Sequence, residues 1–394
     1  MKKAIQLGAG NIGRGFIGAL LAQAGYEVVF ADVAAQIIDR INQDRGYTVH
    51  IMDASCEDIA ITGVRGVDST KPEAVEEIAT ADLVTTAVGP NILPRIAPTV
   101  ARGIERRMAA GCTAPLDVIA CENAVRGTAQ LKKAVYESLS DEAKAFADQY
   151  VCFADCAVDR IVPPVRSANP IDVVVERYFE WDVEKGGLKG EPNVPGMTLV
   201  DRLDAYIERK LFTLNTGHAI TAYLGCLRGC ATIDEAIGKD DIRAIVGAAM
   251  RESGAGLIRK HGFDPAAHET YINTILGRFR NPHLHDDVTR VGREPLRKLS
   301  AGDRLAKPMM TAHGYGLPVG HLLAGMAAAL CYDNPQDAQS VELQRLIETK
   351  GVREAAAETT GLTEAALLDR IAALYDTLHG QKAAGAVDLA QLAI

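Results

Sequence analysis

Short apolar runs alternate with helical patterns along the first part of the chain, and this alternation restricts the fold more than any other feature. Strand–helix–strand units place their strands side by side in parallel, with helices on both faces of the sheet. We therefore predict a doubly wound α/β sheet. The expected strands are Lys3–Leu7, Glu27–Ala31, Tyr47–Met52, Ile59–Thr62, Asp82–Val88, Leu116–Cys121 and Val151–Val158. The expected helices between them are Asn11–Ala24, Ala34–Gln43, Lys71–Ala79, Asn91–Ala109 and one that ends at about Ser138.

The first strand runs directly into a glycine-rich loop that fits the pattern G-x-G-x-x-G. In a Rossmann-like fold, the first glycine makes a tight turn and the second lets the backbone approach a pyrophosphate. The third lets the helix pack against the strand, and the N-terminus of that helix offers N–H groups to the phosphates. The residues expected to bind a dinucleotide are Gly8, Ala9, Gly10, Asn11, Ile12 and Gly13.

Asp32 ends the second predicted strand, about 20 residues beyond the last loop glycine. A carboxylate there accepts hydrogen bonds from the adenosine ribose hydroxyls and repels the 2′-phosphate of NADP. Val-Ala-Ala follows Asp32, and the next arginine is Arg40, so no basic pocket for that phosphate is evident. The sequence therefore predicts NAD as the cofactor.

The sequence changes character from Thr198 onward. Stretches rich in Ala, Leu, Arg and Glu recur at helical spacing, and strand patterns nearly vanish. The Gly- and Pro-rich segment 185–195 is typical of a junction between domains. We predict a Rossmann-like NAD-binding domain over residues 1–192, followed by a mostly α-helical, substrate-binding and catalytic domain over residues 193–394.

Lys210, Asn215 and His218 lie in a helical stretch just past this junction. At about 100° per residue of an α-helix they fall near 0°, 140° and 80°, on one broad face. The apolar neighbours Phe212 and Leu214 indicate that the helix is partly buried. Burial lowers the pKa of a lysine, which suits a general base for an alcohol, and Asn and His side chains can hydrogen-bond the reacting oxygen. The alternative is a solvated lysine, with the Asn and the His in packing roles.

The segment from Arg278 to Lys307 is basic within an acidic chain. It holds eight basic and four acidic residues, a net charge of +4, whereas the whole chain carries −9. Arginine forks suit a small anion such as phosphate. A surface helix laced with ion pairs is the alternative, and nucleic acid is disfavoured because Phe279 is the only aromatic residue for base stacking. The basic residues are Arg278, Arg280, Arg290, Arg293, Arg297, Lys298, Arg304 and Lys307.

Composition narrows the class of protein. Apolar residues make up 48% and charged residues 24% of the chain, which excludes extensive disorder. A net charge of −9 disfavours general binding to nucleic acid or anionic membranes. The longest apolar run, 322–331, is too short to span a bilayer. The first residues lead straight into a strand, so we expect no signal peptide.

Cysteines and histidines give no clear metal pattern. None of the eight cysteines has C-x-x-C spacing, and we expect buried or half-buried free thiols in a reducing cytoplasm. His283 and His285 flank a leucine and precede Asp286 and Asp287, which could be read as metal ligands. Since no further ligand follows at a recognisable spacing, we expect no metal.

Several motifs together carry a resemblance that spans nearly the whole chain. Lys210-x4-Asn215-x2-His218 after a dinucleotide-binding half resembles the signature of the polyol-specific long-chain dehydrogenases. The resemblance implies reversible oxidation of D-mannitol 1-phosphate to D-fructose 6-phosphate, with NAD and without a metal. It is weakest after about Asp337. The other runs similar to that family are 8–18, 121–124, 158–163, 278–282 and 290–299.

The resemblance also implies roles for single residues at matching positions. It makes Lys210 the general base, and the residues that bind and polarise the reacting oxygen are Asn215, His218 and Asn123. Asp159 stands where the family has a substrate-facing carboxylate, and Arg290 and Lys298 match a substrate-binding Arg and Lys. The sequence does not choose which basic side chain holds the phosphate. The candidates are Arg290, Arg293, Arg297 and Lys298.

Two rival functions stay open. A relative that acts on a non-phosphorylated polyol or a sugar acid would use the same residues, and a carboxylate would also be attracted to the basic segment. A non-catalytic NAD-sensing module is a rival from another class, although it would give the Lys–Asn–His set no purpose. We expect a cytoplasmic monomer whose partner is a small sugar phosphate, with no nucleic acid or membrane partner.

Overall fold

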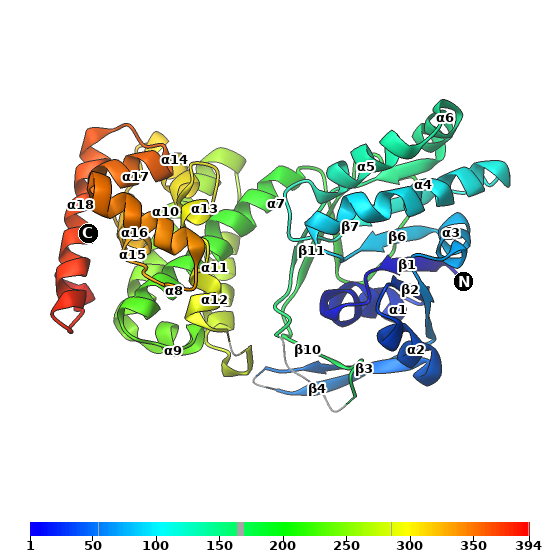
Figure 1. Ribbon diagram of the computed structural model, residues 1–394, viewed down its shortest axis with the longest axis horizontal. Coiled ribbons are helices and arrows are strands. Elements are labelled where there is room, and N and C mark those ends of the chain that lie inside the picture. Colours follow the sequence, from blue (N-terminus) through cyan, green and yellow to red (C-terminus); the bar gives the residue numbers. More distant parts are fainter. Residues whose placement is uncertain (54, 164–168, 285, 393) are drawn as a thin grey trace. The chain divides into compact units, whose positions relative to one another are not determined.

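The computed structural model describes residues 1–53, 55–163, 169–284, 286–392 and 394. Contacts within the chain divide it into two compact units, Met1–Tyr206 and Ile207–Ile394. The first is built on a parallel sheet, and the second is helical (Figure 1). The predicted α/β class with a mostly helical second part is confirmed. The sequence placed the boundary after residue 192, and the first unit continues to Tyr206.

The main sheet of the described chain has six parallel strands in the order β5-β2-β1-β6-β7-β8. This is the order of dinucleotide-binding folds, in which the ligand crevice lies at the carboxyl ends of the strands where the order reverses, here beside β1 and β6. The strands are β1 (Lys3–Leu7), β2 (Glu27–Asp32), β5 (Val64–Asp68), β6 (Leu83–Thr86), β7 (Leu116–Ala120) and β8 (Val151–Phe153).

Alternate residues of the central strands enter two separate cores, as the two-residue period of a strand requires. Ile5 and Leu7 of β1 face one core, and Ala4 faces the other. Helices therefore cover both faces of the sheet, as predicted (Figure 1). The first core lies under α3 (Pro72–Ala79), α4 (Leu93–Ala109), α5 (Gly127–Ser138) and α6 (Asp141–Tyr150). The second lies under α1 (Ala19–Gln23) and α2 (Ala35–Asp44).

The single strand predicted over 151–158 is wrong. The chain leaves the main sheet after Phe153 and enters a small sheet at Cys156. The buried Asp155 at this corner accepts a hydrogen bond from the Ala129 N–H at 3.0 Å, which fixes the turn. The strands of the small sheets are β3 (Gly46–Ile51), β4 (Glu57–Thr62) and β10 (Val173–Val175) in one, and β9 (Cys156–Asp159), β11 (Glu180–Glu184) and β12 (Met197–Val200) in the other.

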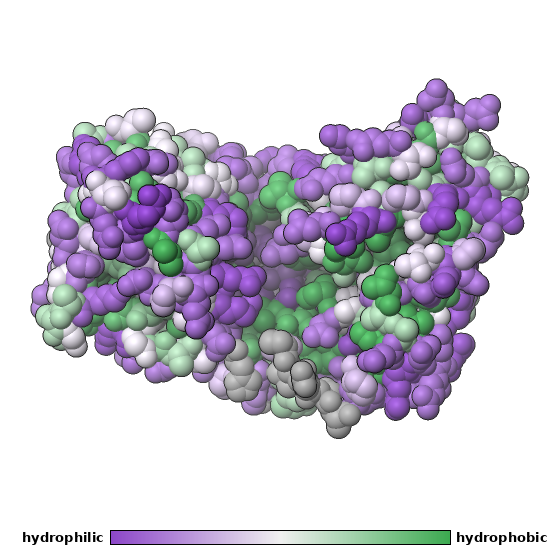
Figure 2. Space-filling model, in the orientation of Figure 1, coloured by the Kyte–Doolittle hydropathy of each residue, from purple (hydrophilic) through white to green (hydrophobic). Residues whose placement is uncertain are grey.

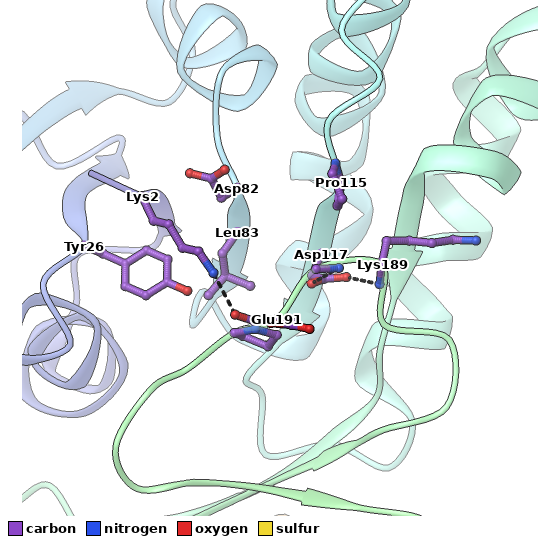
Figure 3. A pocket seen from close by; sticks show the side chains of 10 residues that line it. Lys2, Tyr26, Asp82, Leu83, Pro115, Asp117, Lys189 and Glu191 are labelled. Carbon is purple, nitrogen blue, oxygen red and sulfur yellow. Dashed lines mark hydrogen bonds between the residues drawn. The ribbon is translucent and has the colours of Figure 1, made fainter.

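The Gly- and Pro-rich segment 185–195 lies within the first unit. It crosses the amino edge of the main sheet, where the buried Asp117 accepts hydrogen bonds from the N–H groups of Lys189 and Gly190 at 2.9 and 3.0 Å. A pocket of about 360 Å³ lies here, between this segment and the starts of the strands (Figure 3). Because dinucleotides bind at the carboxyl ends of the strands, this pocket is not the expected cofactor crevice.

The second unit packs its helices around α15 (Gly320–Leu330), which contains most of the longest apolar run of the sequence, 322–331. α15 contacts α8, α10 and α18. In the described part of the chain, every helix is too short or too polar to cross a membrane. Hydrophilic side chains cover much of the visible face of each unit (Figure 2). After α7 (Leu203–Arg209), the other helices are α8 (Thr216–Leu227), α9 (Ile233–Gly238), α10 (Asp240–His261), α11 (Pro265–Phe279), α12 (Val288–Gly292), α13 (Pro295–Leu299), α14 (Ala306–Gly314), α16 (Ala338–Lys350), α17 (Val352–Thr360) and α18 (Ala365–Ala383).

Candidate active site

Glycines shape the loop that follows β1. Gly8 has a φ of +95°, and a Cβ there would lie 2.5 Å from the carbonyl oxygen of Ala87. A Cβ on Gly13 would lie 2.0 Å from the carbonyl oxygen of Gly8, so a larger residue does not fit without a backbone shift. Around Gly10, in contrast, no described atom lies within 4 Å of a Cβ position. This open side of the loop fits the close approach of a pyrophosphate.

Asp32 lies beside this loop at the end of β2. Its Oδ2 accepts a hydrogen bond from the Ala9 N–H at 2.6 Å, and its Oδ1 accepts one from the Ala34 N–H at 2.9 Å. A carboxylate at this position binds the ribose hydroxyls in dinucleotide-binding folds. The loop and Asp32 together therefore fit a dinucleotide, and the helix that follows the loop offers N–H groups to its phosphates.

Arg14 supports the loop from the protein interior. Its side chain is buried, its Nε donates to the Ile171 carbonyl oxygen at 2.8 Å, and its Nη1 donates to the Ala9 carbonyl oxygen. Burial lowers its pKa from the ordinary value, and the nearby Tyr47 and Asp32 oppose this effect. The guanidinium places a positive charge next to the loop that is expected to hold phosphates. Sequence reasoning missed this role, because the loop pattern does not indicate where the side chain points.

Glu122 and Asn123 follow β7 at the same edge of the sheet. Glu122 is buried, and its carboxylate accepts hydrogen bonds from Thr86 Oγ1 at 2.6 Å and from the N–H groups of Val88 and Gly89 at 2.9 Å. These bonds tie the ends of β6 and β7 together. Asn123 is exposed next to this anchor, at the carboxyl edge where the glycine loop also begins. Sequence reasoning gave Glu122 no role, since its partners lie at and just after the end of a different strand.

Asp159 occupies another part of the first unit. It ends β9 in a small sheet, where its register partner on β11 is Glu180. Its side chain is buried. The assignment of Asp159 to the substrate stays a prediction.

The predicted catalytic helix contains a π-helical turn, Lys210–Asn215, between α7 and α8. Backbone hydrogen bonds in a π-helix join residues five apart, so Lys210 and Asn215 come closer together around the helix axis. A continuous α-helix would have separated them by about 140°. His218 follows Asn215 by one α-helical step of three residues, which returns it to the same side. The turn therefore gathers these three half-buried residues on a narrower face than the sequence indicates.

Side-chain hydroxyls stabilise this π-helical turn. Ser253 Oγ on α10 donates to the Phe212 carbonyl oxygen at 2.6 Å, and Ser253 is fully buried. Thr216 Oγ1 donates to the Arg304 carbonyl oxygen at 2.7 Å. A π-helical turn displaces carbonyl groups such as that of Phe212 from their α-helical donors, so a buried carbonyl group there needs another donor, whereas the bond from Thr216 anchors the end of the turn to a segment outside it. Tertiary contacts of this kind hold the turn in the shape that aligns the candidate residues.

His218 lies between an aromatic ring and a buried carboxylate. Its ring stacks on Phe279 with centroids 4.9 Å apart and an interplanar angle of 18°. Its Nε2 lies 2.9 Å from Oδ2 of Asp286, and Oδ1 of Asp286 accepts a hydrogen bond from Arg290 Nε at 2.8 Å. Burial raises the pKa of Asp286, but His218 and Arg290 outweigh it, and the pKa is lowered overall. Sequence reasoning missed this pairing, because no spacing pattern links residues so far apart.

Two of the four candidates for phosphate binding are engaged by carboxylates. Arg290 contacts Asp286, as described above. Arg297 pairs with Glu294 at 2.8 Å and with Asp303 at 3.0 Å. The basic segment could be a phosphate site or a surface of ion pairs. For these two arginines the structure favours the surface of ion pairs.

The other two candidates differ in exposure. Lys298 is only 3% exposed, its Nζ donates to the Arg293 carbonyl oxygen, and burial lowers its pKa to about 7. The Arg293 side chain is exposed, and it forms no ion pair with the residues that the structure describes. Among the four, Arg293 is therefore the side chain most available to an external anion.

Histidine, carboxylate and thiol side chains form no metal site among the residues that the structure describes. His283 is exposed, and His285 lies outside the described residues. No group of three or more His, Cys, Asp or Glu side chains among the described residues is arranged to hold a metal ion. The eight cysteines are free thiols, and all but one are buried or half-buried; Cys56 is exposed, so the expectation of burial is wrong there.

Comparisons with known families cover both units. A family model described as the mannitol dehydrogenase Rossmann domain matches residues 2–196. A second model, described as the mannitol dehydrogenase C-terminal domain, matches residues 202–379.

Two solved structures share the fold. A D-sorbitol dehydrogenase in substrate-free form is similar over 97% of this chain and 95% of its own, with a TM-score of 0.82 and 16% sequence identity. The Pseudomonas fluorescens mannitol 2-dehydrogenase, in a ternary complex with NAD and D-mannitol, is similar over 96% of this chain and 91% of its own. Its TM-score is 0.71 at 17% identity. At such identities the likeness concerns the fold.

Proposed function

This chain belongs to the mannitol dehydrogenase family, and we propose that it is an NAD-dependent polyol dehydrogenase. The observation that carries the proposal is the π-helical turn, which sets Lys210, Asn215 and His218 on one face. A base and two hydrogen-bonding groups on one face suit removal of a proton from an alcohol and stabilisation of the oxygen left behind.

The cofactor would be held by the loop 8–13, with Asp32 on the ribose hydroxyls. The open space at Gly10 and the place of Asp32 beside Ala9 support this assignment. The carboxylate disfavours the 2′-phosphate of NADP. When bound, NAD supplies the acceptor for the hydride that leaves the carbinol carbon.

In the mechanism, the residues of this chain transfer the proton of the substrate hydroxyl and stabilise the negative charge that develops on its oxygen. Neutral Lys210 takes the proton of the substrate hydroxyl, and protonated Lys210 returns it in the reverse direction. Asn215 and His218 hydrogen-bond the same oxygen as negative charge develops on it. Oriented donors of this kind are most effective where little water competes with them, which the half-buried positions of Lys210, Asn215 and His218 favour.

The substrate pair in this proposal is D-mannitol 1-phosphate and D-fructose 6-phosphate, so the activity is that of a mannitol-1-phosphate 5-dehydrogenase. The support is the net charge of +4 over Arg278–Lys307 in a chain of −9, together with the motif resemblance. Arg293 is the proposed phosphate contact, because its exposed guanidinium can form a bidentate pair with phosphate oxygens.

The second candidate is a dehydrogenase for a non-phosphorylated polyol. The ion pairs of Arg290 and Arg297 favour it, because carboxylates already neutralise these two arginines. The two solved structures described above are named for sorbitol and mannitol, neither of which carries a phosphate.

NADH oxidation with fructose 6-phosphate and with fructose separates these functions. A phosphate-specific enzyme oxidises NADH with fructose 6-phosphate and far more slowly with fructose. Comparable efficiency with both sugars would support the second candidate. Oxidation with neither sugar, in a protein that still binds NADH, would indicate a non-catalytic NAD-binding module and contradict the proposal.

A further inference from the structure

We propose that Asp286 is a positioning residue that fixes the tautomer of His218, so that Nδ1 of the ring serves the reacting oxygen. The catalytic consequence rests on the proposed function. The tautomer itself concerns the second unit alone and can be measured without any substrate.

The geometry around the ring carries this inference. His218 Nε2 and Asp286 Oδ2 are 2.9 Å apart, although the ring N–H is not directed along the line between them. Both atoms are fully buried, and neither hydrogen-bonds any other residue of the described chain. A buried polar atom without a partner destabilises the fold by about 1–3 kcal/mol. Each of these two atoms is the polar partner that spares the other this destabilisation. The stack on Phe279 holds the ring plane while leaving its Nε2 edge toward the carboxylate.

The carboxylate of Asp286 is itself held in one orientation. The backbone carbonyl oxygen of Asp286 accepts a hydrogen bond from the Ile233 N–H at 2.9 Å, and a β-bridge joins the adjacent Asp287 to Thr232. On the side chain, Arg290 Nε donates to Oδ1 at 2.8 Å. Because Arg290 occupies Oδ1, the carboxylate presents Oδ2 to His218.

A carboxylate accepts hydrogen bonds but cannot donate them, so Asp286 selects the tautomer of His218 that carries the proton on Nε2. The carboxylate also accepts from Nε2 when the ring is protonated, and that charged ring donates from Nδ1 to the reacting oxygen, whereas in the neutral ring Nδ1 carries a lone pair. A carboxylate that holds a histidine in this way sets both its tautomer and its direction, as happens where histidines act in catalysis or bind metals.

Asp286→Asn provides a specific test. Arg290 continues to donate to Oδ1 of the asparagine, so the amide NH₂ group occupies the place of Oδ2 and faces Nε2. An NH₂ group needs an acceptor, and the ring proton therefore moves to Nδ1. Long-range ¹H–¹⁵N NMR of protein labelled at histidine, without substrate and at a pH where the ring is neutral, shows which nitrogen carries the proton. The His218 signals are assigned by their loss in His218→Gln.

The wild type is expected to give the Nε2–H form and Asp286→Asn the Nδ1–H form. Asp287→Asn is the matched control, because it makes the same change at the exposed neighbouring residue, and it should keep the wild-type tautomer. An Nδ1–H form in the wild type, or the same tautomer in the wild type and Asp286→Asn, overturns the proposal. If Asp286→Asn does not fold, as judged by circular dichroism, the wild-type spectrum alone decides.

Activity gives the second readout. Asp286→Asn should lower kcat by about 100-fold, the scale of a lost charge-stabilising donor, because an NH₂ group that faces Nε2 excludes the charged ring and leaves a neutral donor on Nδ1, while the KM for NADH and the melting temperature change little. Asp287→Asn should match the wild type in all three. If the wild-type protein oxidises NADH with neither fructose 6-phosphate nor fructose, the proposed function fails, and the NMR result still decides whether Asp286 sets the tautomer of His218.

Discussion

Asp32 accepts a hydrogen bond from the Ala9 N–H on Oδ2 at 2.6 Å, and this bond ties the glycine loop to the end of β2. Its second oxygen accepts the Ala34 N–H at 2.9 Å. The carboxylate therefore shapes the loop and also stands where a ribose is expected. A substitution at this position affects both the shape of the loop and the choice of cofactor.

Asp32→Ala should narrow the preference for NAD over NADP. The variant loses the acceptor for the ribose hydroxyls and no longer repels the 2′-phosphate, so efficiency falls more with NAD than with NADP. The measurement is kcat/KM for both cofactors at a fixed sugar concentration. An unchanged ratio of the two efficiencies would mean that Asp32 does not contact the ribose. Asp39→Ala, on α2, is the control and should leave the ratio as it is.

Alanine substitutions at Gly10 and Gly13 should have different consequences. At Gly13 the new Cβ meets the Gly8 carbonyl oxygen at 2.0 Å, and overpacking of this kind costs about 1–3 kcal/mol of stability. At Gly10 the new Cβ meets no described atom within 4 Å, so the fold should hold while NADH binding weakens. Thermal unfolding and NADH titration by fluorescence measure the two effects. Normal NADH affinity in Gly10→Ala would show that the pyrophosphate lies elsewhere.

The main sheet was largely predictable because its central strands are short apolar runs with clear ends. β1, β2 and β7 lie within one residue of their predicted bounds. β5 was missed, since Val64–Asp68 contains an arginine, a glycine and an aspartate and lies at the sheet edge. Gly66 in this strand leaves room for Ile38, since a Cβ on Gly66 would lie 2.9 Å from the Ile38 side chain. The sequence alone does not show this contact.

The candidate site was predictable in its residues but not in its geometry. The spacing of Lys210, Asn215 and His218 indicates a shared face, yet the π-helical turn depends on tertiary bonds such as that from Ser253 to the Phe212 carbonyl oxygen. Local patterns cannot report such bonds, because the partners belong to different helices. The pairing of His218 with Asp286 is hidden for the same reason.

Lys210→Ala should lower turnover by about two to four powers of ten, the usual scale for a lost acid–base group. NADH binding should persist, because the glycine loop is unchanged. Steady-state kinetics and NADH titration measure the two quantities. Lys350→Ala is the matched control, since Lys350 is half-exposed and pairs only with Glu358 among the described carboxylates. If Lys210→Ala retains more than a tenth of wild-type turnover, Lys210 is not the base.

Arg293→Ala should raise the KM for fructose 6-phosphate by about tenfold to 100-fold, because a charged hydrogen bond contributes about 1.5–3 kcal/mol. The KM for NADH should not change, and neither should the weak activity with fructose. Arg353→Ala, which removes a surface guanidinium paired with Asp369, is the control. Equal losses with both sugars would place Arg293 on the polyol hydroxyls instead of the phosphate. If Arg293→Ala behaves like the wild type, Arg293 does not bind the phosphate, and the basic segment is an ion-paired surface.

Lys298 should make the folded state more stable as the pH rises above neutral. Burial lowers its pKa from 10.5 to about 7, so between these values the unfolded chain holds a proton that the folded protein has released. Unfolding then takes up a proton, and a higher pH therefore favours the folded state. Below about pH 7 Lys298 is protonated in both the folded and the unfolded state, so the buried charge lowers the stability of the folded state by its full amount. Lys298→Met removes this dependence, although it leaves the Arg293 carbonyl oxygen without its donor.

The quantity to follow is the difference in melting temperature between the wild type and Lys298→Met, measured at pH 7 and pH 9.5. The difference should shift in favour of the wild type at the higher pH, because only the wild type gains from deprotonation there. Using the difference cancels the other groups that titrate in this range. Lys350→Met, at an exposed lysine, should show the same difference at both pH values. A constant difference for Lys298→Met as well would mean that Lys298 keeps its proton in the folded protein.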